Sequence, residues 1–363
     1  MSVFIDQMVV KRRYLSEQEL VELIALCSIL PGPTSTQTIV SIGYKMGGPL
    51  LAFLTMLVWA LPVLIVMSAL SFLYAFLVSV DISIDVLRYI GPMAVGFIIV
   101  AAVRIGRKVV TDVTTACLAV ASAVTTFYFR TPWIFPVVLV AGGAVAMIVY
   151  REGEMWNPVR VAPPWRYIVL FAVFAVGGIA AAAVFEARLV QMFESFYRYG
   201  YLVFGGGQVV VPIMHTELVE VRRYMTNQEF LTGYGLIQGL PGPMFSFAAY
   251  AGGMASRGFG TIVQVVGAAI GGVGIFLPGL LLIYFVYPIW EDLKKIRAFK
   301  ISLRGVNAVA GGLISIAAVI LFQATGFHVD TIIVTALTAA LLGFTRIPAP
   351  LIVAASIAAG FVI

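Results

Sequence analysis

The amino-acid sequence predicts an all-α polytopic membrane protein made of two inverted-topology repeats, each with broken, re-entrant half-helices. The 363 residues are 61% hydrophobic and only 11% charged, far from the roughly 25% charged residues of soluble domains. Segment 11–37 recurs without a gap as 221–247, with ten identical positions in twenty-seven. Each copy carries a Pro-Gly-Pro sequence inside apolar residues, where proline and glycine end a helix.

Apolar runs that could cross about 30 Å of hydrocarbon recur along the whole chain. The candidate spans are 50–78, 91–110, 112–129, 132–150, 166–185, 260–288, 303–322, 329–344 and 347–363. They leave no soluble domain of useful size, so we expect a multi-pass protein of the cell membrane. The net charge of +6 lies in short loops and does not indicate nucleic-acid binding. Cys27 and Cys117 both lie in apolar sequence, which argues against a disulfide framework.

The basic residues of matching loops have opposite bias in the two halves. Loop 79–90 carries one basic residue and its counterpart 289–304 carries five, whereas 104–112 carries three and 323–330 none. By the positive-inside rule, the halves then lie upside down relative to each other. The extra helix at 166–185 supplies the odd crossing. We therefore divide the chain into an N-terminal repeat (1–150), an inverting linker helix (151–188) and a C-terminal repeat (189–363).

The segments on either side of each Pro-Gly-Pro sequence are too short to span a membrane. Residues 17–30 and 34–48 are predicted to form two half-helices that meet at a tip and enter from the cytoplasm. Residues 226–240 and 244–257 are predicted to do the same from outside. A further break at 204–208 divides 189–221. Because irregular backbone at membrane depth must line a cavity or be buried in protein, these breaks are the best pointers to a binding site.

The helix that follows Pro33 presents unpaired N–H groups and a positive dipole end, which bind anions. Its first turn also holds four polar side chains: Thr34, Ser35, Thr36 and Gln37. The second copy has Met244, Phe245, Ser246 and Phe247 in these places. We expect unequal sites, the first solvating an oxyanion and the second acting as an apolar gate. Simple capping by the hydroxyl groups is the alternative.

The repeated charges have two interpretations each. Two arginine pairs, Arg12 with Arg13 and Arg222 with Arg223, could guide a divalent oxyanion or anchor the topology, and both roles stay open. Glu19 and Glu229 could couple protons, but the spacing Ser/Thr-x-x-Glu favours capping. The paired glycines at 271–272 and 311–312 are expected to allow close helix packing. His215 and His328 lack partner ligands, and no nucleotide loop or nucleophile–base pair is visible. We therefore expect no metal, no cofactor and no enzyme activity.

These blocks resemble the chromate ion transporter family, in its long, two-domain form. The resemblance rests on the paired Arg-Arg-Tyr…(Ser/Thr)-x-x-Glu…Leu-Pro-Gly-Pro blocks and on Phe-Gly-Gly-Gly at 204–207, and it extends over nearly the whole chain. It implies transport of chromate, alongside or in competition with sulfate, with efflux giving resistance. The family's glycine block in the first half would fall before residue 1. We expect a truncated start, and the alternative is that this member lacks the first glycine-block helix, half of one broken element.

The sequence thus predicts a secondary transporter that exports chromate, and sulfate as a related substrate, by alternating access in the lipid bilayer. The alternatives are a carrier or channel for another oxyanion such as sulfate, and a membrane-embedded scaffold or enzyme subunit. A homodimer and the coupling ion are left open. The predicted substrate-binding residues are Pro31, Gly32, Pro33, Thr34, Ser35, Thr36, Gln37, Gly205, Gly206, Gly207, Gln208, Pro241, Gly242, Pro243, Ser246, Arg12, Arg13, Arg222 and Arg223.

Overall fold

The computed structural model describes residues 5–12, 14–79, 84–151, 162–204, 207–293 and 296–362. Within these residues every regular element is helical, which confirms the all-α prediction. In chain order, with η for a short 3₁₀- or π-helix, the elements are η1 (Ile5–Lys11), α2 (Glu17–Ile29), α3 (Thr34–Ser79), η2 (Ile84–Leu87), α4 (Ile90–Val109), α5 (Val113–Tyr128), α6 (Ile134–Val149), α7 (Trp165–Val184), α8 (Arg188–Leu202), η3 (Gly207–Val209), α9 (Val210–His215), η4 (Thr216–Val221), α10 (Asn227–Gln238), η5 (Met244–Ser246), α11 (Phe247–Ser256), α12 (Thr261–Val286), η6 (Tyr287–Ile289), α13 (Trp290–Leu293), α14 (Arg297–Ala324), α15 (Val329–Phe344) and α16 (Ala349–Val362).

Among the described residues, five helical stretches are long and apolar enough to cross a membrane, as a polytopic protein requires. They contain α3, α4, α7, α12 and α14. The apolar helices α5, α6 and α15 have 16 residues and α16 has 14, about 24 Å or less at a rise of 1.5 Å per residue. Helix α15 coincides with the predicted span 329–344, whereas α5, α6 and α16 each begin and end one or two residues inside their predicted spans. Asp112 caps the start of α5 and so stays outside that helix.

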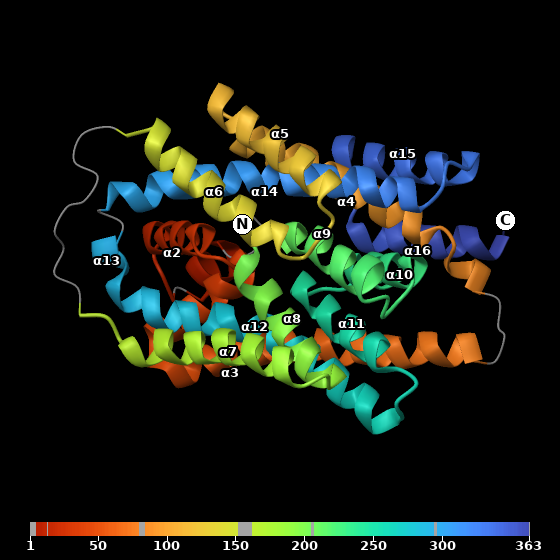
Figure 1. Cartoon of the computed structure of the whole chain (residues 1–363), viewed down its shortest axis with the longest axis horizontal. Helices are drawn as coiled ribbons and strands as arrows, with labels where there is room; N and C mark the ends of the chain where they lie inside the picture. Colours follow the sequence, from red (N-terminus) through yellow and green to blue (C-terminus); the bar gives the residue numbers. More distant parts are fainter. Residues whose placement is uncertain are drawn as a thin grey trace.

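The helices form two layers with broken segments between them (Figure 1). One layer holds α4, α5, α6, α14, α15 and α16, and the other holds α3, α7, α8, α11 and α12. Short α9 contacts α8 on one side and α14 on the other, and α10 contacts both α11 and α4. The first Pro-Gly-Pro break is enclosed by protein at Gly32 and Pro33, as irregular backbone in a membrane requires, whereas Pro241 and Gly242 of the second break are exposed.

Each layer combines helices from both halves of the chain. Helix α5 packs on α14, and its counterpart α15 packs on α4, so matching helices exchange partners between halves. The half-helices α2 and α10 lie toward opposite ends of the long axis in Figure 1. The opposed orientation of the repeats in the membrane and the three-part division of the chain stay predictions.

Glycine pairs allow the closest helix crossings, as predicted. A Cβ built at Gly312 of α14 would lie 2.0 Å from the carbonyl oxygen of Ala119 in α5. One built at Gly271 of α12 would lie 2.1 Å from the carbonyl oxygen of Ala248 in α11. No larger side chain fits at either place without moving a helix backbone.

Asp112 joins the two halves in the loop between α4 and α5. Its carboxylate accepts hydrogen bonds from the Thr115 N–H (2.8 Å), the Tyr150 hydroxyl (2.6 Å) and Arg304 of α14 (2.5 Å). These contacts lower the pKa of Asp112 to about 2. The hydrogen bond from the Thr115 backbone has the largest effect, followed by that from the Tyr150 hydroxyl. The loop therefore carries a fixed negative charge at every physiological pH.

Candidate oxyanion site

The first Pro-Gly-Pro sequence breaks the chain between α2 and α3, as predicted. Helix α2 ends at Ile29 and α3 begins at Thr34. Pro31 and Pro33 have no N–H to continue the helix, and Gly32 has φ +125°, a conformation that favours glycine. The Gly32 N–H donates to the carbonyl oxygen of Val203 at 2.7 Å. The first break therefore lies directly against the end of α8.

The first turn of α3 holds buried polar atoms that lack partners. Thr36 and Gln37 are only 3% and 2% exposed. The Gln37 Nε2 donates to the carbonyl oxygen of Pro31 at 2.6 Å, but Gln37 Oε1 and Thr36 Oγ1 have no hydrogen-bond partner. Leaving such an atom unpaired costs about 1–3 kcal/mol, so an unpaired cluster marks a place where a polar ligand is favoured.

The backbone of this turn adds further donors. The Gln37 N–H makes the first helical bond, to Pro33 at 2.9 Å. The N–H groups of Thr34, Ser35 and Thr36 precede it and belong to the orphan donors of a helix start. Ser35 is exposed, so its hydroxyl is already open to solvent, whereas Thr36 is enclosed.

The second Pro-Gly-Pro sequence ends α10 and leads into an apolar turn. Gly242 has φ +146° and packs against Val63 of α3. The following residues Phe245 and Phe247 are buried, and Ser246 is fully buried with an unpaired Oγ. This turn thus offers one hydroxyl where the first copy offers several polar groups. Its role as a gate stays a prediction.

The described ends of the break between α8 and α9 contact the two Pro-Gly-Pro segments. Its first end, at Val203, accepts the bond from Gly32, and Gly207 at its other end packs against Met244 and Phe245. Gln208 Oε1 accepts a hydrogen bond from the Tyr234 hydroxyl. The predicted residues Gly205 and Gly206 lie outside the described residues. The internal space beside Met244 and Phe245 has no room for a water molecule, whereas Pro241 and Gly242 of the second tip are exposed.

The predicted arginines do not gather at the tips. Arg12 and Arg223 are exposed, and Arg13 lies outside the described residues. Arg222 is three-quarters buried and bonds to Glu217 through Nε at 2.9 Å. Its Nη1 donates to Gln191 at 2.7 Å. Arg222 is therefore already paired in this conformation, and no described contact links it to the Pro-Gly-Pro residues.

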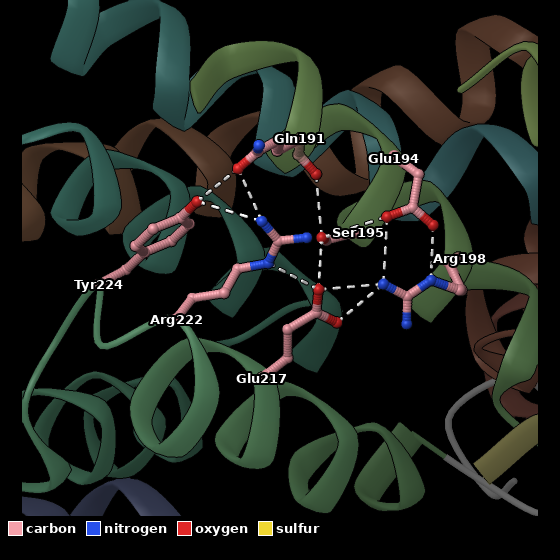
Figure 2. Close-up of polar contacts among 7 residues, drawn as sticks. All are labelled: Gln191, Glu194, Ser195, Arg198, Glu217, Arg222 and Tyr224. Atoms are coloured by element: carbon pink, nitrogen blue, oxygen red, sulfur yellow. Dashed lines mark hydrogen bonds and ion pairs between the residues drawn. The ribbon is translucent and has the colours of Figure 1, made fainter. Parts of the chain in front are cut away.

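A buried ionic cluster surrounds Arg222 and was not predicted from the sequence (Figure 2). Arg198 of α8 is 2% exposed and bonds to Glu194 on its own helix (2.6 Å) and to Glu217 (2.9 Å). The four-residue spacing of Glu194 and Arg198 in the sequence could have signalled a helical ion pair. Nothing in the sequence places Glu217 beside them, because that contact depends on how α8 and η4 pack.

A second polar network on η4 contains Glu220, which pairs with Arg130 at 3.2 Å. The nearby His215 Nε2 lies 2.9 Å from Asn227 Oδ1. Across the described residues, no group of three or more His, Cys, Asp or Glu side chains is arranged to hold a metal ion.

The capping predictions for the repeated glutamates are confirmed. Ser16 with Glu19 and Thr226 with Glu229 each form a complete capping box at the start of α2 and α10. Each glutamate also has a cationic partner: Glu19 pairs with Lys45, and Glu229 pairs with Arg257. Both carboxylates are thus fully engaged in holding half-helices.

A family model described as Chromate transporter matches residues 1–148 and 190–361. The chain belongs to this family. The chromate transport protein of Pseudomonas aeruginosa is 27% identical over 333 residues, covering 90% of this chain and 77% of the relative. A probable chromate transport protein of Synechococcus elongatus is 24% identical over 358 residues, covering 98% and 88%. The chromate transport protein of Cupriavidus metallidurans is 23% identical over 362 residues, covering 97% and 84%.

No solved structure matches the chain. Membership of the chromate transporter family and the long apolar helices together make it a multi-pass protein of the cell membrane. In this chromate transporter family member, the two matched regions contain one Pro-Gly-Pro break each.

Proposed function

We propose that the chain is a secondary transporter that exports chromate from the cytoplasm by alternating access, with sulfate as a competing substrate. The relatives named as chromate transport proteins, which match most of the chain, support this substrate. The observation that carries the proposal is the buried, unpaired Thr36 hydroxyl at the helix start that follows Pro33. A hydroxyl donor and a positive helix end are what a doubly negative oxyanion favours.

The membrane potential alone is sufficient to drive this export. An inside-negative potential of 100 mV favours the exit of each negative charge by about 2.3 kcal/mol, so a divalent anion gains about 4.6 kcal/mol. No coupling ion is then required for efflux. The dry apolar packing beside Met244 and Phe245 supports a barrier there in one state of the alternating cycle.

The test compares two threonines in proteoliposomes loaded with chromate. Thr36→Val removes the hydroxyl at the proposed site and keeps the side-chain shape. Thr126→Val is the matched control, because the Thr126 hydroxyl of α5 is also buried and unpaired but lies in a different helix. Loss of a hydrogen bond to a charged ligand costs about 1.5–3 kcal/mol. The chromate concentration that half-saturates transport should therefore rise about tenfold or more in Thr36→Val and stay unchanged in Thr126→Val.

Equal half-saturating chromate concentrations for the two variants would refute the proposed binding site at Thr36. If the wild-type protein moves neither chromate nor sulfate, the function itself is wrong. A carrier or channel for another oxyanion such as sulfate is the second candidate, and counterflow separates the mechanisms. Internal chromate should accelerate uptake of labelled chromate through a carrier, whereas a channel shows no such acceleration.

A further inference from the structure

The Glu217 carboxylate is held by three donors from two separate elements (Figure 2). Its Oε1 accepts from Ser195 Oγ at 2.8 Å, Arg198 Nη2 at 3.0 Å and Arg222 Nε at 2.9 Å. Its Oε2 accepts from Arg198 Nη2 at 2.9 Å. Glu217 is 1% exposed, so the carboxylate is removed from water and depends on these donors.

This donor set matches the requirements of an oxyanion. A guanidinium group presents a planar fork of donors that fits paired oxygens of carboxylate or tetrahedral anions alike. Here Arg198 of α8 and Arg222, which follows η4, converge on one acid, and the Ser195 hydroxyl completes the set. By contrast, Glu194 is bound by Arg198 of its own helix, at the ordinary four-residue spacing.

Arg198 has a donor that no acceptor in the cluster satisfies. Its Nη1 is buried and has no hydrogen-bond partner, its side chain is 3% exposed, and its guanidinium lies 4.9 Å from the centre of the Trp133 ring. Figure 2 shows this nitrogen turned away from both glutamates. A carboxylate brings two oxygens and one charge, whereas a tetrahedral dianion brings four oxygens and two charges. Such a dianion therefore offers the donors of Arg198 and Arg222 more acceptor oxygens than the Glu217 carboxylate does.

The first repeat shows that the backbone does not require a charge at this place. In both copies the arginine N–H closes the same five-residue turn, from Arg12 to Gln7 O at 3.1 Å and from Arg222 to Glu217 O at 2.8 Å. The residue that matches Glu217 is Gln7, which is neutral. The Glu217 carboxylate is thus retained for its side-chain contacts with the arginines, not for the π-helical closure.

The cluster lies close to the first tip along α8. Arg198 precedes Val203 by five residues, about 7.5 Å along a helix axis, and Val203 accepts the hydrogen bond from Gly32. The helix that carries Arg198 therefore ends against the first tip.

We propose that Arg198, Arg222 and Ser195 form a second oxyanion seat, which Glu217 fills in this conformation and leaves when a divalent oxyanion arrives. The Glu217 carboxylate then takes the place of the transported anion and neutralises Arg198 and Arg222 between transport events. This inference rests on the proposed function for its substrate class. It adds a second anion-binding site to the one proposed at the Thr36 turn.

The test measures equilibrium binding of sodium sulfate and sodium chromate to purified full-length protein. Glu217→Gln keeps the side-chain size but removes the competing charge, so the arginines become available. We expect sulfate to bind about tenfold tighter than to wild type, as one charge-assisted hydrogen bond of about 1.4 kcal/mol would give. Transport by this variant should saturate at lower chromate concentration and run more slowly, because the anion leaves the seat less readily.

Glu220→Gln is the matched control, because it removes the same charge from the same π-helix and Glu220 pairs only with Arg130 among the described arginines. We expect unchanged sulfate affinity in this control. The double variant Glu217→Gln with Arg222→Gln should lose the gain. Unchanged or weaker binding in Glu217→Gln, or an equal gain in Glu220→Gln, would overturn the second seat.

Glu217→Asp keeps the inference testable if Glu217→Gln does not fold. The shorter carboxylate cannot reach both guanidinium groups, so sulfate affinity should still rise, by less than in Glu217→Gln, and an unchanged affinity overturns the proposal. Wild-type transport is measured in parallel. If the wild-type protein transports chromate but neither Glu217 variant gains sulfate affinity, only the second seat is refuted. If the wild-type protein transports no chromate, the proposed function is refuted.

Discussion

Replacing Gly32 by alanine is expected to weaken both the fold and the candidate oxyanion site, because Gln37 occupies the space that a Cβ needs. Gly32 has φ +125°, and a Cβ built there would lie 2.7 Å from Gln37 Nε2. The same nitrogen donates to the Pro31 carbonyl oxygen at 2.6 Å. The substitution therefore forces the Gln37 amide away from Pro31.

The magnitude follows from a comparison with Gly48, which has φ +70° and open space around its Cβ position. Both alanine variants carry the backbone cost of an unfavourable φ, about 1–3 kcal/mol. Only Gly32→Ala also removes the bond from Gln37 to Pro31, which adds about 1–3 kcal/mol. The free energy of unfolding should thus fall about 1–3 kcal/mol further in Gly32→Ala than in Gly48→Ala.

The assay measures denaturant unfolding of both variants in detergent and chromate transport in proteoliposomes, normalised to folded protein. Because Gln37 adjoins the Thr36 hydroxyl, we expect Gly32→Ala to lose about tenfold in transport, and Gly48→Ala to keep its rate. Equal unfolding free energies for the two variants, or full transport per folded molecule of Gly32→Ala, would refute the reasoning.

Two further predictions concern the charged caps. Glu229→Gln should lower the free energy of unfolding by about 2 kcal/mol, because Glu229 is buried and bonds to Arg257 at 2.8 Å. The more exposed Glu19→Gln should lower it less, and equal losses in a denaturant titration would contradict the effect of burial. Asp112→Asn should lower Tm by a constant amount from pH 5 to pH 8, and the difference should shrink as the pH falls from about 4 towards 2. The Thr115 N–H helps to hold the pKa of Asp112 at about 2, below its ordinary 3.8, so the carboxylate stabilises the fold above pH 4 and loses this effect as it is protonated. A Tm difference that changes near neutral pH would assign the stabilisation to another group.

Residues that act locally made much of this fold predictable. Proline and glycine at 31–33 and 241–243 end helices whatever surrounds them, so both breaks were predicted in place. The spacing of Ser16 and Glu19 and of Thr226 and Glu229 predicted both capping boxes for the same reason. The apolar runs located the long helices, although not the shorter length of α5, α6 and α16.

The features that depend on packing could not be predicted. The pairing of Arg222 with Glu217 joins two elements through contacts with α8, and no sequence spacing encodes it. The sequence therefore suggested that Arg222 is free to bind an anion, whereas in the structure Glu217 neutralises it. For the same reason, nothing indicated that Val203 would receive the Gly32 N–H, a contact that places one break against another.

The short connection between α8 and α9 touches both Pro-Gly-Pro tips, so neither tip is mechanically independent. Gly32 reaches it through a hydrogen bond of 2.7 Å, and Met244 through packing on Gly207. A hydrogen bond of this kind is lost once its atoms separate by about 1 Å more. Val203 and Gly207, the described ends of this connection, thus tie the position of the two tips to α8 and to the start of η3.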